Sequence, residues 1–322
     1  MSVRCYTRQD AAEVLRLWND YGDQIGYAPQ SMEGLDELML SHPNFCPQHS
    51  FILENKDGIH GFITGTSGEE LENGKDTGYF TCLLLDDEFD TDEATEIMLT
   101  RLEDSFRSAG LTKIYESCFD PIHLPWIIAG TPGHQHNNMP AIPRDTQLYQ
   151  RMQKLGYTEK GTEIAMYLNL KDFQMPEAIL EKEKAMAQAG YTVDWYDESK
   201  HVGVDEMVES LHNSMWSAEV PAAAHSGMRL LVGLEGNRVA GFTGPVYPQP
   251  TGRGYFAGLA VGPAFEGHGL GKLLFYRLCA AEKECGSQYM SLFTGIDNHA
   301  QKIYKEIGFK IVRYYAEMLK EL

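Results

Sequence analysis

The sequence has few cysteines and no long apolar run, and each absence excludes a class of protein. Its six cysteines are scattered, without a Cys-x-x-Cys pair, which argues against a disulfide framework or a thiolate metal site. We expect reduced thiols in a cytoplasmic protein. No apolar stretch reaches the ~20 residues that cross a bilayer, and the first residues lack the apolar core of a signal peptide. The sequence therefore predicts no membrane partner.

Basic residues are also scarce. There are 27 Lys and Arg against 46 Asp and Glu, which gives a formal net charge of −19. Such a surface repels a phosphate backbone, so we expect no nucleic-acid partner. The hydrophobic content of 43% and the charged content of 23% are typical of a globular protein, and 322 residues suffice for two domains.

The most informative segment is 259–274, which reads as an apolar strand, a glycine loop and an apolar-periodic helix. Gly267, Gly269 and Gly271 allow a tight turn whose N–H groups point outward. The start of the following helix adds unpaired N–H donors and a positive dipole end at the same place. The spacing matches neither Gly-x-x-x-x-Gly-Lys-Ser/Thr nor Gly-x-Gly-x-x-Gly. The segment therefore predicts a pyrophosphate site of another kind.

A second segment, 297–309, reads as a short helix that is capped by Asp297 or Asn298 and ended by Gly308, with a strand after it. Together the two segments resemble the GNAT acetyltransferase superfamily. The first resembles its acyl-CoA pyrophosphate loop. The second resembles its Asn…Tyr…Gly-Phe segment, here Asn298, Tyr304, Gly308 and Phe309.

The resemblance implies an N-acetyltransferase that uses acetyl-CoA as co-substrate, needs no metal, and acts on a small-molecule amine by direct transfer in a ternary complex. It implies that Tyr304 is the catalytic acid that protonates the departing thiolate, and that strand residues bind the pantetheine arm. Two alternatives remain: a mycothiol-synthase-like acetyltransferase, and a non-catalytic acyl-CoA-binding sensor or scaffold. The cofactor-binding residues so implied are Leu259, Ala260, Val261, Gly267, His268, Gly269, Leu270, Gly271, Lys272, Asn298 and Tyr304.

An internal repeat extends the resemblance over nearly the whole chain. Residues 51–62 align with 231–242, 83–89 with 259–265, and 154–157 with 306–309. We therefore predict two tandem GNAT-like α/β (α+β) domains, each a mixed, mostly antiparallel sheet flanked by helices. Their expected bounds are 1–170 for a degenerate copy, 171–190 for a helical linker, and 191–322 for the acyl-CoA-binding copy. A monomer and a homodimer both remain open.

The first copy lacks the glycine loop, since Asp90, Asp92, Glu93 and Glu96 stand in its place, and Met152 replaces the tyrosine. Carboxylates in a first helical turn cap that helix and repel an anion. We therefore expect acyl-CoA to bind only the second copy.

The first copy also has an inserted loop, 119–143, which contains Trp126, His134 and His136. Long loops in compact domains are usually functional. We expect this loop either to form the far wall of the acceptor pocket or to pack against its own domain.

Two features of the second copy depart from the family pattern. Glu266 stands where the family has Arg or Gln, and we expect Lys272 and backbone amides to compensate for its charge. The strand before the loop carries no carboxylate that would serve as general base. Glu219, His225 and a water chain all remain candidates for that role.

Overall fold

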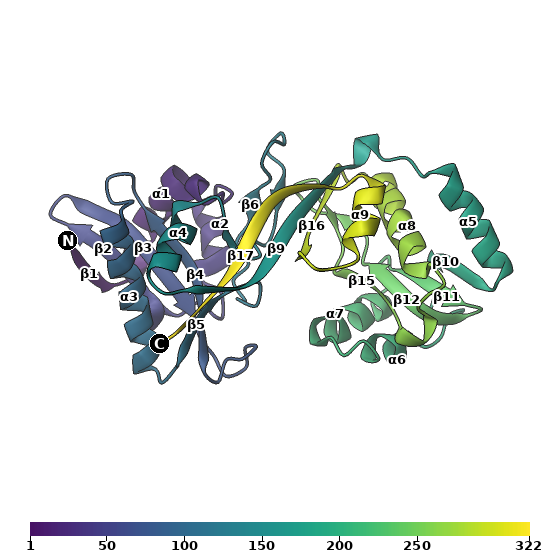
Figure 1. Ribbon diagram of the computed structural model, residues 1–322, viewed down its shortest axis with the longest axis horizontal. Helices are drawn as coiled ribbons and strands as arrows, with labels where there is room; N and C mark the ends of the chain where they lie inside the picture. Colours follow the sequence, from purple (N-terminus) through teal and green to yellow (C-terminus); the bar gives the residue numbers. More distant parts are fainter. The chain divides into compact units, whose positions relative to one another are not determined.

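The computed structural model describes residues 1–322, apart from the side chains of Ser214 and Met215, and forms two compact units (Figure 1). Unit 1 comprises Met1–Ala165, Phe293–Asp297 and Ile311–Leu322. Unit 2 comprises Met166–Leu292 and Asn298–Lys310. Each unit combines a sheet with flanking helices. None of the helices in the part of the chain that is described has both the length and the apolar composition to cross a bilayer.

The sheet of unit 1 begins as a series of antiparallel neighbours. Strand β4 then pairs in parallel with β5, and β17 pairs antiparallel with the other side of β5, where Met318 lies opposite Glu116. The order continues through β9 and β16. The strands are β1 (Ser2–Cys5), β2 (Ser50–Asn55), β3 (Gly58–Thr66), β4 (Thr77–Leu85), β5 (Lys113–Glu116), β9 (Thr158–Asn169), β16 (Tyr289–Gly295) and β17 (Lys310–Glu321).

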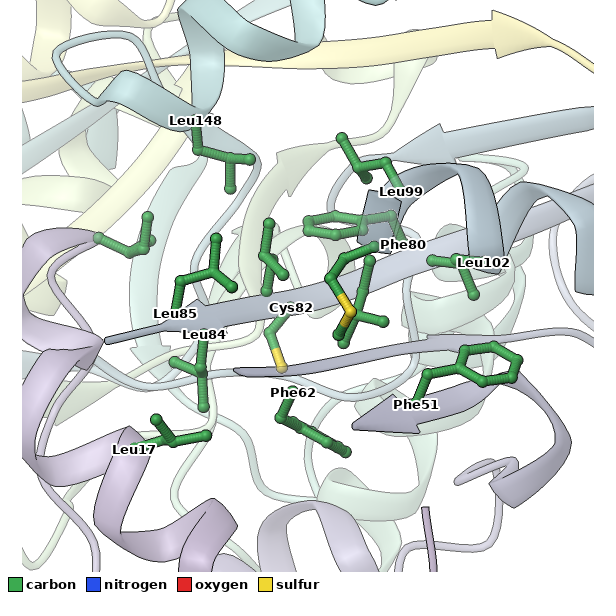
Figure 2. Packing of buried hydrophobic residues seen from close by; sticks show 14 of the residues in the cluster. Leu17, Phe51, Phe62, Phe80, Cys82, Leu84, Leu85, Leu99, Leu102 and Leu148 are labelled. Atoms are coloured by element: carbon green, nitrogen blue, oxygen red, sulfur yellow. The ribbon is translucent and has the colours of Figure 1, made fainter. Parts of the chain in front are cut away.

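Helices cover both faces of this sheet. Figure 2 shows Leu84 of β4 directed toward Leu17 of α1 (Ala11–Tyr21), whereas Phe80 lies beside Leu99 of α3 (Asp92–Ser108). Every residue of β4 is buried, because it is covered from both sides. Two shorter helices, α2 (Met32–Leu35) and α4 (Gln147–Lys154), complete the unit.

The inserted loop packs into unit 1. It forms β6 (Trp126–Ile127), β7 (Gln135–His136) and β8 (Ile142–Pro143). Trp126 is fully buried against Tyr315 of β17, with ring centroids 5.5 Å apart, and His136 is 3% exposed. Neither side chain has surface to offer an acceptor. The expected contact of Trp126 and His136 with the acceptor is therefore not supported, because both belong to the core of their own unit.

Unit 2 is built on an antiparallel sheet in the order β10 (Tyr191–Trp195), β11 (Leu231–Glu235), β12 (Arg238–Gly244) and β15 (Gly258–Val261). Val232 and Leu234 of β11 pack against α6 (Val204–Glu209) and α7 (Ser214–His225). Gly233 between them faces Leu270 of α8 (Leu270–Glu284). Since alternate residues of a strand point to opposite faces, α6 and α7 cover one face and α8 the other (Figure 1).

The remaining elements of unit 2 are β13 (Tyr247–Pro248), β14 (Gly254–Tyr255), α5 (Glu177–Gln188) and α9 (Gln301–Ile307). Helix α5 occupies most of the predicted linker, 171–190. Its Glu183 accepts a hydrogen bond of 2.7 Å from Arg277 Nε of α8, so the helix is fastened to unit 2.

The two units repeat the same strand register, which confirms the internal repeat. The hairpins β2–β3 and β11–β12 have their bulges at equivalent positions. The parallel pairing of β4 with β5 begins at the position equivalent to the parallel bridge between Arg253 and Tyr289. The corresponding pairs are Leu53–Gly61 and Gly233–Gly241 in the hairpins, Gly61–Leu85 and Gly241–Val261 at the next strand, and Thr77–Lys113 and Arg253–Tyr289 between the diverging strands. A shared register with a shared bulge is a property of one fold used twice.

The structure divides the chain differently from the predicted bounds at three strands, β9, β16 and β17. The first domain was expected to span 1–170, whereas unit 2 begins at Met166, and Phe293–Asp297 of the expected second domain lies in unit 1. The second domain was also expected to keep its last strand, within 191–322, whereas Ile311–Leu322 lies in unit 1. The reason is the pairing of β17 with β5, in which four residue pairs run from Met318–Glu116 to Glu321–Lys113.

Candidate functional site

The site in unit 2 begins at a strand edge without a strand partner. Strand β15 pairs with β12, and among the described residues no strand pairs with its other edge. Gly262 N donates to Ala240 O at 2.8 Å, and bonded pairs alternate along an antiparallel ladder, so Ala260 also bonds to β12. The peptide groups of Leu259 and Val261 therefore point away from β12. All four residues of β15 are half-buried, unlike the buried β4.

The glycine loop opens the start of α8 beside this edge. Gly267 and Gly269 have φ of +83° and +80°, in the left-handed region that favours glycine. Gly269 is the N-cap of α8, and no side chain caps the helix there. The Cβ of a residue at 271 would lie 3.5 Å from Val261 Cγ2, which places the first turn of α8 on β15. The loop thus presents free N–H donors next to the unpaired edge.

The charges around the loop are arranged differently from our expectation. Glu266 is exposed and makes no ion pair with any described residue. Lys272 forms an ion pair with Glu306 of α9, so its charge is already balanced and does not offset Glu266. His268 stacks on Tyr191, with ring centroids 4.5 Å apart.

A residue that the sequence interpretation missed lies at the same place. A side chain at position 269 would collide with the ammonium of Lys182 and would lie 2.9 Å from its Cε. Lys182 belongs to α5, in the segment interpreted as an exposed linker helix. The one signal in the sequence was indirect: a loop with Glu in place of Arg or Gln needs a cation from elsewhere.

Tyr304 projects from α9 with a free hydroxyl. The predicted cap by Asp297 or Asn298 is wrong, because α9 begins after Ala300 without a side-chain cap; Asn298 Oδ1 instead accepts a hydrogen bond of 2.9 Å from Ala300 N. Gly308, with φ of +112°, ends the helix as predicted. The Tyr304 ring packs on Phe275 of α8 at 4.8 Å between centroids. The side chain is half-buried, its hydroxyl makes no hydrogen bond to the described residues, and burial raises its pKa. Tyr304 is therefore a protonated phenol at neutral pH.

The structure places the two side chains proposed as general base, Glu219 and His225, in different surroundings. Glu219 of α7 accepts a hydrogen bond of 2.6 Å from the hydroxyl of Tyr255 in β14. Tyr255 lies two residues after Arg253, which bridges to Tyr289. His225 lies at the exposed end of α7, and Asp205, 3.1 Å away, raises its pKa. The carboxylate of Asp205 favours the protonated form of His225 and so disfavours it as a base, which makes Glu219 the better candidate.

In unit 1 the start of the corresponding helix, α3, is capped and covered by side chains of unit 1 itself. Thr91 caps α3 by accepting from Ala94 N at 3.2 Å. Arg151 of α4 donates to Asp92 at 3.0 Å and to the carbonyl oxygen of Asp90 at 2.7 Å, and its side chain also forms an ion pair with the Asp90 carboxylate. The position equivalent to the predicted pyrophosphate site is thus occupied by the guanidinium of Arg151 and by the carboxylates of Asp90 and Asp92 that balance its charge.

A cavity of about 260 Å³ remains next to this ion-pair cluster in unit 1. Its lining includes Leu83, Leu84 and Leu85, which correspond to the strand residues of the site in unit 2. Met152, at the position of Tyr304, is fully buried and carries no proton to donate.

No metal site was expected. Among the residues described, no three His, Cys, Asp or Glu side chains are grouped as ligands. The six cysteines are free thiols.

Comparisons with known proteins agree with this geometry. Residues 178–309 match the acetyltransferase (GNAT) family. The chain is similar to the fungal multi-domain GH3 β-N-acetylglucosaminidase that contains a GCN5-related glucosamine N-acetyltransferase region, at 14% identity and a TM-score of 0.70 over 99% of this chain, which spans 38% of that one. No curated protein matches.

Two further structures are similar over almost their whole length. A GCN5-related N-acetyltransferase from Sphaerobacter thermophilus has 14% identity and a TM-score of 0.63, over 99% of this chain and 95% of that one. A tandem GNAT protein from the clavulanic acid biosynthesis pathway has 11% identity and a TM-score of 0.59, over 99% and 98%. The chain thus has the tandem GNAT fold, a mixed α/β fold used twice, as the sequence predicted. Its residues 178–309 are the part of the chain that matches the acetyltransferase (GNAT) family.

Proposed function

We propose that this protein is an acetyl-CoA-dependent N-acetyltransferase that acts on a small amine, with its active site in unit 2. One observation carries the proposal: the open edge of β15, the uncapped start of α8 and the free hydroxyl of Tyr304 are built by adjoining elements. These are a hydrogen-bonding strand, an anion seat and a proton donor. Together they suit a long acyl thioester with a phosphate end and a thiolate leaving group.

Each group has a defined task in this proposal. The peptide groups of Leu259 and Val261 bind the amides of the pantetheine arm, and the N–H groups after Gly269 bind the pyrophosphate. The co-substrate supplies the acetyl group as a thioester. Glu219 first takes a proton from the protonated amine. The neutral amine then forms a C–N bond as the C–S bond breaks, Tyr304 gives its proton to the thiolate sulfur, and the proton that the nitrogen then loses passes through solvent to the Tyr304 oxygen. Holding both reactants together supplies much of the rate.

Release of free CoA from acetyl-CoA tests the proposal. We expect release with at least one primary amine from a panel that includes glucosamine, because a structural neighbour contains a glucosamine N-acetyltransferase region. The product should be the acetylated amine, identified by mass spectrometry. If acetyl-CoA binds tightly and no amine in a broad panel releases CoA, the protein is an acyl-CoA-binding sensor instead.

A further inference from the structure

We propose that Lys182 of α5 is a phosphate-binding residue of the acyl-CoA site, with its ammonium on a phosphate of CoA at the start of α8. This rests on the proposed function, and it adds a residue from outside the glycine loop. Lys182 lies in the segment that the sequence marked as a linker.

The first step is the position of the ammonium. Lys182 Nζ lies so close to Gly269 that any Cβ at that residue would collide with it. Gly269 is the N-cap of a 15-residue helix, so the N–H donors of the first turn of α8 lie next to the ammonium. The side chain thus reaches the place where the family's loop holds a pyrophosphate.

The second step is that this position is unfavourable without an anion. The start of a helix carries a partial positive charge, so a cation placed there is repelled. Lys182 makes no ion pair or hydrogen bond with any described residue. A lysine side chain is long and flexible enough to turn to solvent. Its approach to α8 is favourable when a phosphate lies between the ammonium and the free N–H groups.

The third step is that α5 is held in place. Residues on either side of Lys182 anchor the helix: Glu183 bonds to Arg277 of α8, and Ile179 and Met186 are buried. The Cα of Lys182 is therefore fixed relative to the glycine loop. A phosphate would need to order only the side chain.

Unit 1 provides an internal comparison. There too a basic side chain, Arg151, lies over the start of the equivalent helix, and the carboxylates of Asp90 and Asp92 neutralise it. In unit 2 a carboxylate, Glu266, also stands at the position of Asp90, but it is exposed and makes no ion pair with Lys182, and His268 stands at the position of Asp92. The arrangement in unit 1 is complete by itself, whereas that in unit 2 calls for an anion from outside.

The test compares Lys182→Gln with Lys184→Gln in the full-length protein. Lys184 lies on the same helix, is exposed, and makes no ion pair in the described structure, so it controls for the loss of one charge. Calorimetry gives the Kd of each variant for CoA, dephospho-CoA and pantetheine. We expect Lys182→Gln to weaken CoA about 10-fold or more, in line with a charge-assisted hydrogen bond. Lys184→Gln should stay within about 2-fold.

The ligand series distinguishes the two phosphate groups. An equal loss for CoA and dephospho-CoA assigns Lys182 to the pyrophosphate, and a loss for CoA alone assigns it to the 3′-phosphate. Pantetheine should bind both variants equally, and Lys182→Arg should restore most of the affinity. If Lys182→Gln binds CoA as tightly as the wild type, the inference is wrong. Its failure is distinct from that of the proposed function, because the wild type would still bind CoA and acetylate the amine.

Discussion

Tyr304 and Met152 hold the same position in the two copies, on a helix that ends at a left-handed glycine. In both copies the residue after that glycine donates its N–H to the carbonyl of this position, Phe309 to Tyr304 and Tyr157 to Met152. The backbone is therefore conserved in geometry between the copies, and the difference lies in one side chain. Only the copy with the phenol has a proton to give.

Replacing Tyr304 with Phe should test that role. The ring and its contact with Phe275 stay, and only the hydroxyl is lost. We expect the single-turnover rate of acetyl transfer to fall by roughly 10- to 1000-fold, as is usual for one general acid, while the Kd for CoA changes little. An unchanged chemical step would make Tyr304 a packing residue.

Glu219 allows a test based on the basicity of the acceptor. An alkylamine has a pKa near ~10.4 and must lose a proton before it attacks, whereas an arylamine is already neutral. Glu219→Gln keeps the size of the side chain and its contact with Tyr255. We expect kcat/KM to fall about 100-fold for the alkylamine and little for the arylamine. Equal losses for both would show that Glu219 does not act as the base.

Asp120 of unit 1 predicts a pH-dependent stability. It is 8% exposed and accepts hydrogen bonds from the hydroxyl of Thr81 at 2.6 Å and from Ile122 N at 2.8 Å, yet burial raises its pKa to about 7. Between pH 4 and pH 7 the folded state keeps a proton that the unfolded state has lost. The free energy of unfolding should therefore fall as pH rises through this range, by up to about 1.4 kcal/mol per pH unit for one proton.

Urea unfolding of the wild type and of Asp120→Asn at pH 5 and pH 8 measures this effect. We expect the variant to lose less stability than the wild type between the two pH values. Part of the loss should stay, because burial also raises the pKa of Glu116 and of Glu163, the latter to about 7. An identical pH dependence in the two proteins would exclude Asp120 as a source.

At the scale of the element, the sequence predicted what local pattern encodes. The aligned hairpins, 51–62 and 231–242, contain the glycines and apolar positions that set a strand register, and the structure repeats that register to the bulge. The end of the helix at Gly308 could be predicted from the residue type, because glycine favours the left-handed conformation that ends a helix. Arg151 and Lys182 were missed, because each acts on a helix start far away in the sequence, and no local pattern records such a contact.

A substitution at the start of α8 tests whether CoA binds there. Gly269→Asp places a carboxylate on the uncapped helix and next to Lys182, which imitates the arrangement in unit 1. We expect calorimetry to find one CoA site per chain in the wild type and none in this variant. Two equivalent sites, or binding that survives the substitution, would place the CoA site elsewhere.

Gly286→Asp is the matched control. Gly286 also has a left-handed φ, +94°, and nothing lies within 4 Å of a Cβ there. It therefore carries the same backbone cost of about 1–2 kcal/mol without a charge at the loop. This variant should bind CoA like the wild type.

At the scale of the whole molecule, the feature that the sequence did not indicate is the place of β17. We predicted for each copy a sheet of its own flanked by helices, which places the last strand of the chain in the second copy, 191–322. Strand pairing across more than 200 residues depends on which edge is free, and the edge of β5 accepts Glu321, Lys320, Leu319 and Met318. Register can be inferred from local pattern, but the choice of partner cannot.

Deleting residues 311–322 should therefore destabilise unit 1. The deletion removes the pairing with β5 and the hydrogen bonds of Lys320 to buried Glu103 at 2.8 and 2.9 Å. We expect intrinsic fluorescence to report a urea transition at lower concentration, while Lys320→Ala, which keeps the strand, should give a smaller shift. A transition that does not move would show that β17 contributes nothing to unit 1.

Because β17 belongs to unit 1 but follows unit 2 in the sequence, it also affects when unit 1 can complete its folding during synthesis. Residues 1–165 leave the ribosome without the strand that covers β5, and most of unit 2 is made before it follows. At about 5–20 residues per second, translation of 166–310 takes on the order of 10 s. During that time β5 has an open edge, which is a site for pairing with another nascent chain. Unit 1 thus begins to fold first and finishes last, so its yield depends on the speed of the ribosome and on chaperones that shield that edge.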